Sequence, residues 1–161
     1  LQAVDIAPWT GNDERQNTER RAEVADMLST AQDSGALKEA ITCVNQTGQP
    51  HPDVAATEDG SSALGETLAQ TIAEQYNYRI SIEYPTGSGI ESVEIGPTPT
   101  PPETATVSVS QYVVLTDSDP IYEVDRTCQL SGTELDEGSI YIDDEGSGSV
   151  YAVVNVRVIA W

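Results

Sequence analysis

The sequence contains very little positive charge. Seven Lys plus Arg stand against 27 Asp plus Glu in 161 residues, which gives a formal net charge of −20. Phosphate groups bind through clustered basic side chains, so this balance excludes nucleic acid as a partner. The carboxylates are scattered between well-patterned apolar runs, which excludes a disordered acidic tail. The length suits a single folded domain.

Lysine is reduced to one residue, Lys38. Like charges crowded on one surface repel in dilute buffer, whereas at about 1 M salt a Debye length of about 3 Å screens them. The acidic surface and the depletion of lysine resemble proteins of halophilic archaea. This resemblance implies a halophilic, archaeal, acidic protein that has the cations of a concentrated salt solution as partners, and a fold that needs salt.

Residues typical of active sites are scarce. The only histidine, His51, lies between two prolines in a predicted loop, and no G-x-S-x-G nucleophile elbow is present. Glu83 and Glu94 are the one potential glycosidase pair. Both fall on the polar side of predicted strands, where a solvated face is the better interpretation. We therefore predict a non-enzymatic protein without catalytic residues or cofactors.

Two acidic turns are weak candidates for a cation site, because hard cations prefer oxygen ligands. Asp117 and Asp119 lie in the first turn, and Asp143, Asp144 and Glu145 begin the second. Neither turn follows the EF-hand spacing. Acidic turns are expected throughout so acidic a chain, so solvated turns are the default interpretation and no metal is predicted.

Only two cysteines are present, Cys43 and Cys128, and their context lacks the CxxC or Cys/His spacing of zinc sites. They are either small core residues or a disulfide, and an extracellular setting favours the disulfide. The bond closes a loop of 85 residues (128 minus 43). The loop-entropy model gives such a bond about 4 to 5 kcal/mol.

One triplet, Asn45-Gln46-Thr47, fits the pattern of an N-glycosylation acceptor. It opens a stretch of prolines and small polar residues, 45–60, that is predicted to be a surface loop. A loop suits an acceptor, and such triplets also arise by chance. Asn45 is therefore a possible N-glycosylation site.

The first half of the chain has helical periodicity. Apolar residues at i, i+3, i+4 and i+7 predict a helix over about 13–32, and the same spacing predicts a second helix over 37–44. A third helix is expected to begin after Ser61 or Ser62 and to reach about residue 76. The preceding stretch 8–11 contains Pro8 and Gly11 and is expected to lie outside the first helix.

From residue 78 the apolar period becomes two, which is typical of strands. Residues 78–84 and a strand around 93–95, joined by the turn 85–89, predict a hairpin. Other predicted strands cover residues 105–115, 121–124, 139–142 and 150–161. The last is apolar on both faces in places and is expected to be central. Helices followed by strands predict an α+β class, with N-terminal helices packed on one face of an antiparallel β-sheet.

Three stretches carry a family resemblance: Leu1-Gln2-Ala3-Val4-Asp5-Ile6-Ala7-Pro8, residues 19–37, and Tyr151-Ala152-Val153-Val154-Asn155-Val156-Arg157-Val158-Ile159-Ala160-Trp161. They are similar to haloarchaeal surface proteins of an uncharacterised family that resemble type IV pilins in plan. In those pilins a charged leader and an apolar helix precede such an opening. The chain begins without methionine, and the resemblance implies that an apolar helix precedes it. Residues 1–12 are then its lead-in, and residues 13–161 form one α+β extracytoplasmic domain.

The resemblance implies a structural protein at the cell surface or outside the cell, membrane-anchored in its full-length form. It would be a pilin-like or pseudopilin-like component of a surface appendage or secretion system. Its partners would be other copies or related surface subunits, and the membrane through the N-terminal helix. The alternative is a surface binding module, an adhesin or a virion or envelope protein, that uses an exposed sheet face.

Overall fold

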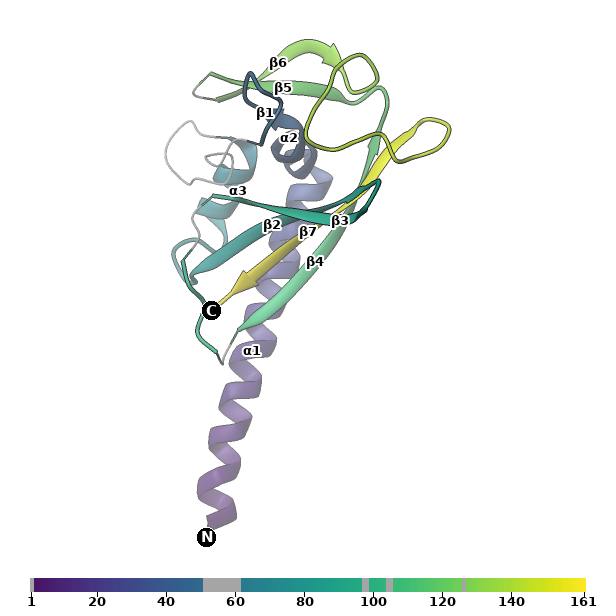
Figure 1. Cartoon of the computed structure of the whole chain (residues 1–161). Helices are drawn as coiled ribbons and strands as arrows, with labels where there is room; N and C mark the ends of the chain where they lie inside the picture. The colour runs from purple at the N-terminus through teal and green to yellow at the C-terminus, as the bar shows by residue number, and fades with distance from the viewer. Residues whose placement is uncertain (1, 51–61, 97–98, 104–105, 126) are drawn as a thin grey trace.

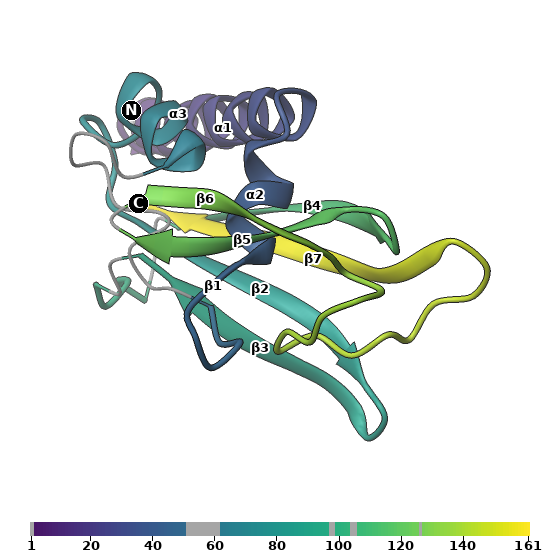
Figure 2. The same cartoon turned by 90° about the horizontal axis from the view of Figure 1, so that it is seen from above.

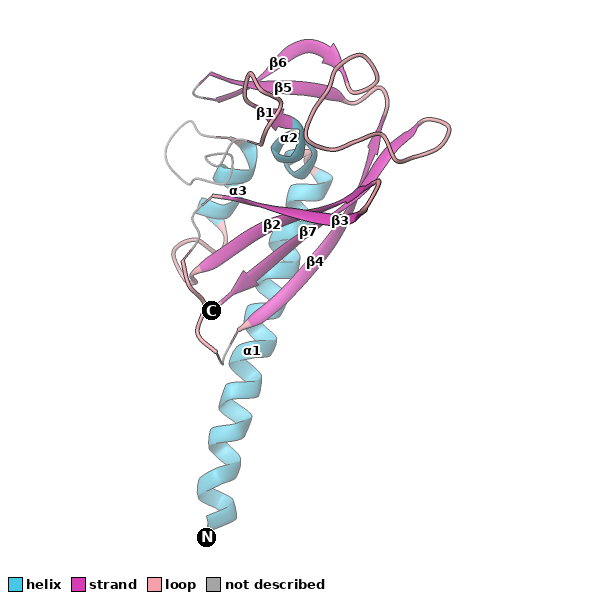
Figure 3. Cartoon of the chain, viewed as in Figure 1, coloured by secondary structure: helices cyan, strands magenta, loops and turns pink. Residues whose placement is uncertain are grey.

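The computed structural model describes residues 2–50, 62–96, 99–103, 106–125 and 127–161, with backbone alone for residues 2–14, 124, 125 and 127. The described residues form three helices and seven strands (Figures 1 and 3). The helices are α1 (Gln2–Asp33), α2 (Ala36–Thr42) and α3 (Ala63–Gln70). The strands are β1 (Cys43–Val44), β2 (Tyr78–Thr86), β3 (Gly89–Ile95), β4 (Val107–Thr116), β5 (Pro120–Asp125), β6 (Thr127–Glu134) and β7 (Val150–Ala160).

Helix α1 begins earlier than the sequence predicts. It starts at Gln2 and runs through Pro8 and Gly11. Extending an existing helix needs far less free energy than nucleating one, so the packed turns further along support these first turns. Proline still removes one backbone hydrogen bond there. The helix ends where predicted, at residues 34–35, since Gly35 adopts φ 85° and redirects the chain into α2.

Only the second half of α1 contributes to the core. The predicted apolar stripe of the helix is fully buried, and its first buried member is Val24. This half packs against β4 and β7, whereas the N-terminal turns extend past the end of the sheet (Figure 1). At 1.5 Å per residue, the 32 residues of α1 span about 48 Å. The buried stripe consists of Val24, Met27, Leu28 and Ala31.

Helix α3 is shorter than predicted. Ser62 caps its N-terminus as expected, with its Oγ 2.9 Å from the Gly65 N–H. The helix ends at Gln70, however, because Thr71 leaves the helical conformation. Ile72 is still fully buried, so the apolar spacing that suggested a longer helix comes from a turn that follows α3.

Four strands form an antiparallel sheet in the order β3-β2-β7-β4. The predicted hairpin is confirmed, since Thr86 pairs with Gly89 across a two-residue turn. The prediction that the last strand is central is also confirmed, because β7 pairs with both β2 and β4. Side chains alternate across the sheet, so that Ile82 and Val156 are buried while their neighbours face outward.

The predicted α+β class is therefore confirmed at the level of its elements. Helices α1 and α3 lie beside each other, and α1 also contacts the sheet (Figure 2). The opposite side of the four-stranded sheet carries no helix among the described elements. We call this side the open sheet face; it carries the outward residues of β2, β7 and β4, such as Glu83, Asn155 and Tyr112.

A second sheet, in the order β1-β5-β6, was not foreseen as a separate unit. Its β1–β5 pair is parallel, which departs from the predicted antiparallel arrangement. Strand β6 was missed, and the strand predicted over residues 139–142 is wrong. Ile140 and Ile142 are buried, but their segment pairs with none of the described strands. The Tyr141 hydroxyl instead donates to the Ile41 carbonyl at 2.7 Å, holding the segment as a loop over the core.

The Cys43–Cys128 disulfide is present. It joins β1 to β6, the two strands that flank β5. In a flat sheet, strands two positions apart lie about 10 Å from each other, since neighbours are about 4.8 Å apart. The two Cα atoms are only 5.8 Å apart. The three-stranded sheet is therefore strongly curled, and the bond fixes that curl.

Candidate functional site

Exposed apolar side chains gather on the open sheet face. Val114 of β4 pairs directly with Val153 of β7, and Tyr112 precedes Val114 by two residues on the same face. Tyr112 is 67% exposed, Val114 44% and Val153 46%. Scattered exposed hydrophobic residues are ordinary, whereas a contiguous group is typical of an interaction site. We call Tyr112, Val114 and Val153 the apolar patch.

A polar network borders the apolar patch. Asn155 lies opposite Tyr112 in the register, and its Nδ2 donates to Glu83 Oε1 at 2.9 Å. An Arg157 guanidinium nitrogen lies 3.3 Å from the same carboxylate oxygen. Asn155 Oδ1 and Arg157 Nε are covered and have no hydrogen-bond partner within the described residues. The patch is therefore flanked by the Glu83 carboxylate, which contacts Asn155 and Arg157, and by two covered polar atoms that have no hydrogen-bond partner within the described residues.

The two glutamates weighed as a glycosidase pair each have an arginine partner. Glu83 pairs with Arg157, and Glu94 pairs with Arg79. All four side chains are partly exposed, so each ion pair stabilises the fold by only about 0 to 1 kcal/mol. This arrangement agrees with a solvated strand face, which is how the sequence was interpreted.

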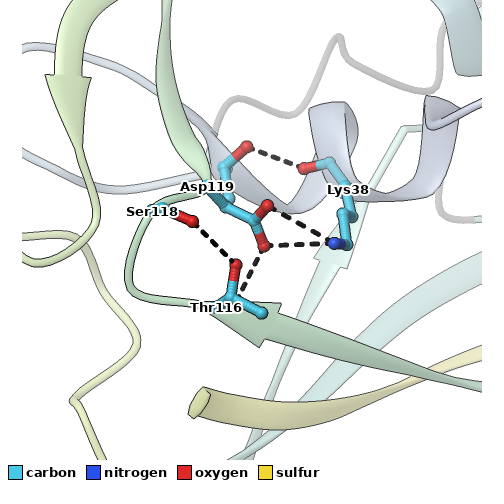
Figure 4. A network of polar contacts seen from close by, with 5 residues as sticks. Lys38, Thr116, Ser118 and Asp119 are labelled. Carbon is cyan, nitrogen blue, oxygen red and sulfur yellow. Dashed lines mark hydrogen bonds and ion pairs between the residues drawn. The ribbon is translucent and has the colours of Figure 1, made fainter. Parts of the chain in front are cut away.

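Asp119, one of the weak candidates for a cation site, binds the only lysine of the chain (Figure 4). Lys38 Nζ, from α2, lies 3.2 Å from Asp119 Oδ2 and 3.4 Å from Oδ1. Oδ2 also accepts the Thr116 N–H at 2.8 Å. The carboxylate thus closes the β4–β5 turn and ties it to α2.

Asp117 lies among other carboxylates. Burial raises its pKa first, and the charges of Asp144 and Asp136 raise it further. Its Oδ1 is covered and accepts no hydrogen bond within the described residues. The structure thus brings Asp117 and Asp144 together from the two predicted turns. Asp136 also lies there, and no sequence signal predicted it.

The remaining weak candidate, Asp143, lies near tyrosines. Its charge contributes to raising the pKa of Tyr84 and of Tyr151, after the larger effect of burial. Asp136 also belongs to a group of three exposed carboxylates, with Glu134 and Glu137, whose oxygens lie within 4.8 Å of one another. Oxygen clusters of this kind suit hard cations, and they are also expected on so acidic a surface.

Tyr76, which follows α3, connects to the outer surface of α1. The Arg20 guanidinium lies 5.3 Å from the centre of the Tyr76 ring. The tyrosine hydroxyl donates to the Glu23 carboxylate, and this hydrogen bond is the main cause of the raised pKa of Tyr76. These contacts join α1 to the turn that follows α3, close to Val24, the first buried residue of the helix.

Asn45 and His51 are the remaining residues that the sequence analysis considered. Asn45 is exposed in the turn that follows β1, and Cys43 is fully buried next to it. His51 lies outside the described residues. Within the described part of the chain, no helix combines the length and the apolar content that a membrane crossing requires.

The comparisons with known proteins identify a family. The chain matches a family of unknown function (DUF7288) over residues 1–160. No curated protein and no solved structure gives a significant match. Because the match spans nearly the whole chain, the protein belongs to the DUF7288 family.

Proposed function

We propose that this DUF7288 protein is a non-enzymatic structural component of the cell surface in a high-salt environment. In this proposal it is a pilin-like or pseudopilin-like subunit of a surface appendage or secretion system. The globular domain lies outside the cell, and the N-terminal direction of α1 leads toward the membrane. Other copies or related surface subunits are its partners.

The observation that carries this proposal is the division of α1 into two parts. Its second half packs on β4 and β7, and its burial begins at Val24. Its first half leaves the domain as a continuous helix (Figure 1). A projecting helix presents turns that extend beyond its own domain. That geometry suits packing against helices of neighbouring subunits, as in pilins.

Charge and covalent structure support the same setting. The net charge of −20 is tolerated where salt screens it. A structural disulfide such as Cys43–Cys128 is typical of proteins outside the reducing cytosol. Neither observation depends on α1, so they support the location independently of the mode of assembly.

Protease treatment of intact cells tests the location. An external protease should remove the full-length protein from intact cells, while a cytosolic marker remains. Retention of the protein until the cells are lysed would contradict the proposed location.

Cysteine cross-linking tests the assembly. Both native cysteines are bonded to each other, so an introduced cysteine provides the only free thiol. Ala22→Cys lies on the exposed surface of α1, and Ser147→Cys, in the loop before β7, is a matched exposed control. Dimers should form on intact cells at position 22 and not at position 147. Equal yields at both positions would contradict packing through α1.

The apolar patch favours a second function, a surface binding module. Three exposed apolar side chains offer contact area beside the Glu83–Arg157 ion pair. Val153→Cys places a thiol in the apolar patch, and its cross-linking is compared with that of Ala22→Cys to distinguish the two functions. Cross-linking of copies at position 22 alone supports the pilin-like function. Loss of cell or surface adhesion in Tyr112→Ser, with position 22 not cross-linked, supports the binding module.

A further inference from the structure

Asn45 differs from the other asparagines of the chain. The sequence has five asparagines, at positions 12, 17, 45, 77 and 155, and only Asn45 is followed two residues later by Ser or Thr. The intervening residue is Gln46 rather than proline, so the acceptor pattern is complete. The structure adds to this pattern by holding the side chain in one particular arrangement.

The oxygen of the Asn45 side-chain amide is fully engaged. It accepts the Thr47 N–H at 2.9 Å, the Thr47 hydroxyl at 2.6 Å and the Gln49 N–H at 3.1 Å. Two of these donors are backbone N–H groups, so the engaged atom must be the oxygen and not the nitrogen. The amide nitrogen therefore lies on the other side, away from the turn. It has no acceptor within the described residues.

The turn that presents this nitrogen is both exposed and firmly supported. Asn45, Gln46 and Thr47 are exposed. The Asn45 N–H donates to the Gln49 carbonyl at 2.9 Å, and the Gly48 N–H donates to the Asn45 carbonyl at 3.0 Å. The chain enters the turn from β1, where Cys43 is held by the disulfide. A hydrogen-bonded turn on the surface therefore presents the side-chain amide of Asn45.

We propose that Asn45 is an N-glycosylation site. The donor is an oligosaccharide joined to a membrane lipid through a phosphate. Asn45 Nδ2 attacks the anomeric carbon of the first sugar, the bond from that carbon to the phosphate oxygen breaks, and the lipid phosphate leaves with the electron pair. Nδ2 loses one proton to a base of the transferase, so no oxidant or reductant takes part.

The position of the turn suits a surface subunit. In Figure 1 the segment around β1 lies at the end of the domain opposite the N-terminus of α1. A glycan there would extend away from the projecting helix and leave the helix free for contacts. This inference rests on the proposed location outside the cell, where such transferases act.

The test directs the full chain through a secretory membrane that carries an N-glycosylation transferase, using a secretion signal. The chain then meets the transferase whatever its natural location, so failure of the site and failure of the proposed location are separate results. Thr86→Asn is the positive control, because it creates a second acceptor triplet with Gly87 and Ser88 on the exposed β2–β3 turn. Intact and peptide mass spectrometry reads occupancy.

A glycan mass is expected on the Asn45 peptide of the unchanged chain and of Thr47→Ser. It should be absent from Thr47→Ala and from Asn45→Asp. The latter keeps the oxygen that holds the turn and removes only the nitrogen, so its melting temperature should match that of the unglycosylated unchanged chain. An unmodified Asn45 in Thr86→Asn chains that carry glycan on the β2–β3 turn would overturn the proposal.

Discussion

Lys38 Nζ lies 3.2 Å from Asp119 Oδ2, so the only lysine in the chain neutralises one particular carboxylate. The pair joins α2 to the β4–β5 turn, and the same carboxylate oxygen accepts the Thr116 N–H. Asp119 therefore has two separable roles, as an ion-pair partner and as a hydrogen-bond acceptor that closes a turn.

Substitutions at position 119 should separate these roles. Asp119→Ala removes both interactions and should lower the free energy of unfolding by about 1 to 2 kcal/mol, as for loss of a capping acceptor. Asp119→Asn keeps the acceptor and should cost less than about 1 kcal/mol, the usual contribution of a partly exposed ion pair. Denaturant unfolding measures both. Equal losses would show that the hydrogen bond contributes nothing.

Glu39 should make stability depend on pH. Burial raises its folded-state pKa, and Glu66 adds to the rise, although the Ala63 N–H opposes it. The folded chain thus binds this proton more tightly than the unfolded chain. The resulting loss of stability is absent below the unfolded pKa and complete above the folded pKa.

Glu39→Gln should therefore raise the melting temperature at pH 7 and have little effect at about pH 3. The substitution retains an oxygen for the Ala63 N–H, which lies 3.5 Å from Glu39 Oε1. Glu66→Gln, at an exposed position, is the matched control and should have a smaller effect that disappears at high salt. Thermal melts at both pH values measure these differences. A lower melting temperature for Glu39→Gln at pH 7 would contradict the prediction.

Loss of the disulfide should destabilise the protein strongly. The bond spans 85 residues of sequence, and removal of such a constraint is expected to lower the free energy of unfolding by about 4 kcal/mol. The Cys43→Ala/Cys128→Ala double variant is the equilibrium test, because it removes the bond without the use of a reductant. Urea unfolding compares it with the oxidised chain. A difference below about 1 kcal/mol would mean that the curled sheet holds without the bond.

Salt should stabilise the fold. Repulsion among 27 carboxylates with only seven basic residues weakens as the Debye length shortens. The melting temperature at pH 7 should rise from dilute buffer to multimolar KCl. At about pH 3 most carboxylates are protonated, so the same increase in KCl should have a much smaller effect. Equal melting temperatures at low and high KCl at pH 7 would contradict the halophilic interpretation.

Backbone protection should differ sharply between the two ends of the chain. Residues 2–11 are helical, but they include Pro8, which lacks a backbone donor, and Gly11, a poor helix former. Strand β7 is hydrogen-bonded on both edges and alternates buried side chains. Amide hydrogen exchange should be fast in residues 2–11 and slowest in β7. Similar rates at both ends would mean that the first turns of α1 are integral to the fold.

The sequence by itself determined the elements whose signals are local. The 3.6-residue spacing of apolar side chains predicted the buried stripe that begins at Val24. The serines at 61 and 62 predicted where α3 begins. The period of two marked β2 and β7, and a short polar turn marked the β2–β3 hairpin. Such signals depend only on residues within a few positions of one another, which is why they are readable without a structure. The alternation at Ile140 and Ile142 misled because burial without a strand partner produces the same pattern.

Tertiary structure decided every feature that depends on distant segments. The parallel β1–β5 pair, the curl fixed by Cys43 and Cys128, and the approach of Asp117 to Asp144 join parts of the chain that have no local signal for each other. The same is true of the apolar patch, since Val114 and Val153 become neighbours only through the β4–β7 register. Long-range pairing is selected by the total burial of the core, so a single chain's sequence shows which residues seek burial and not which partners they find.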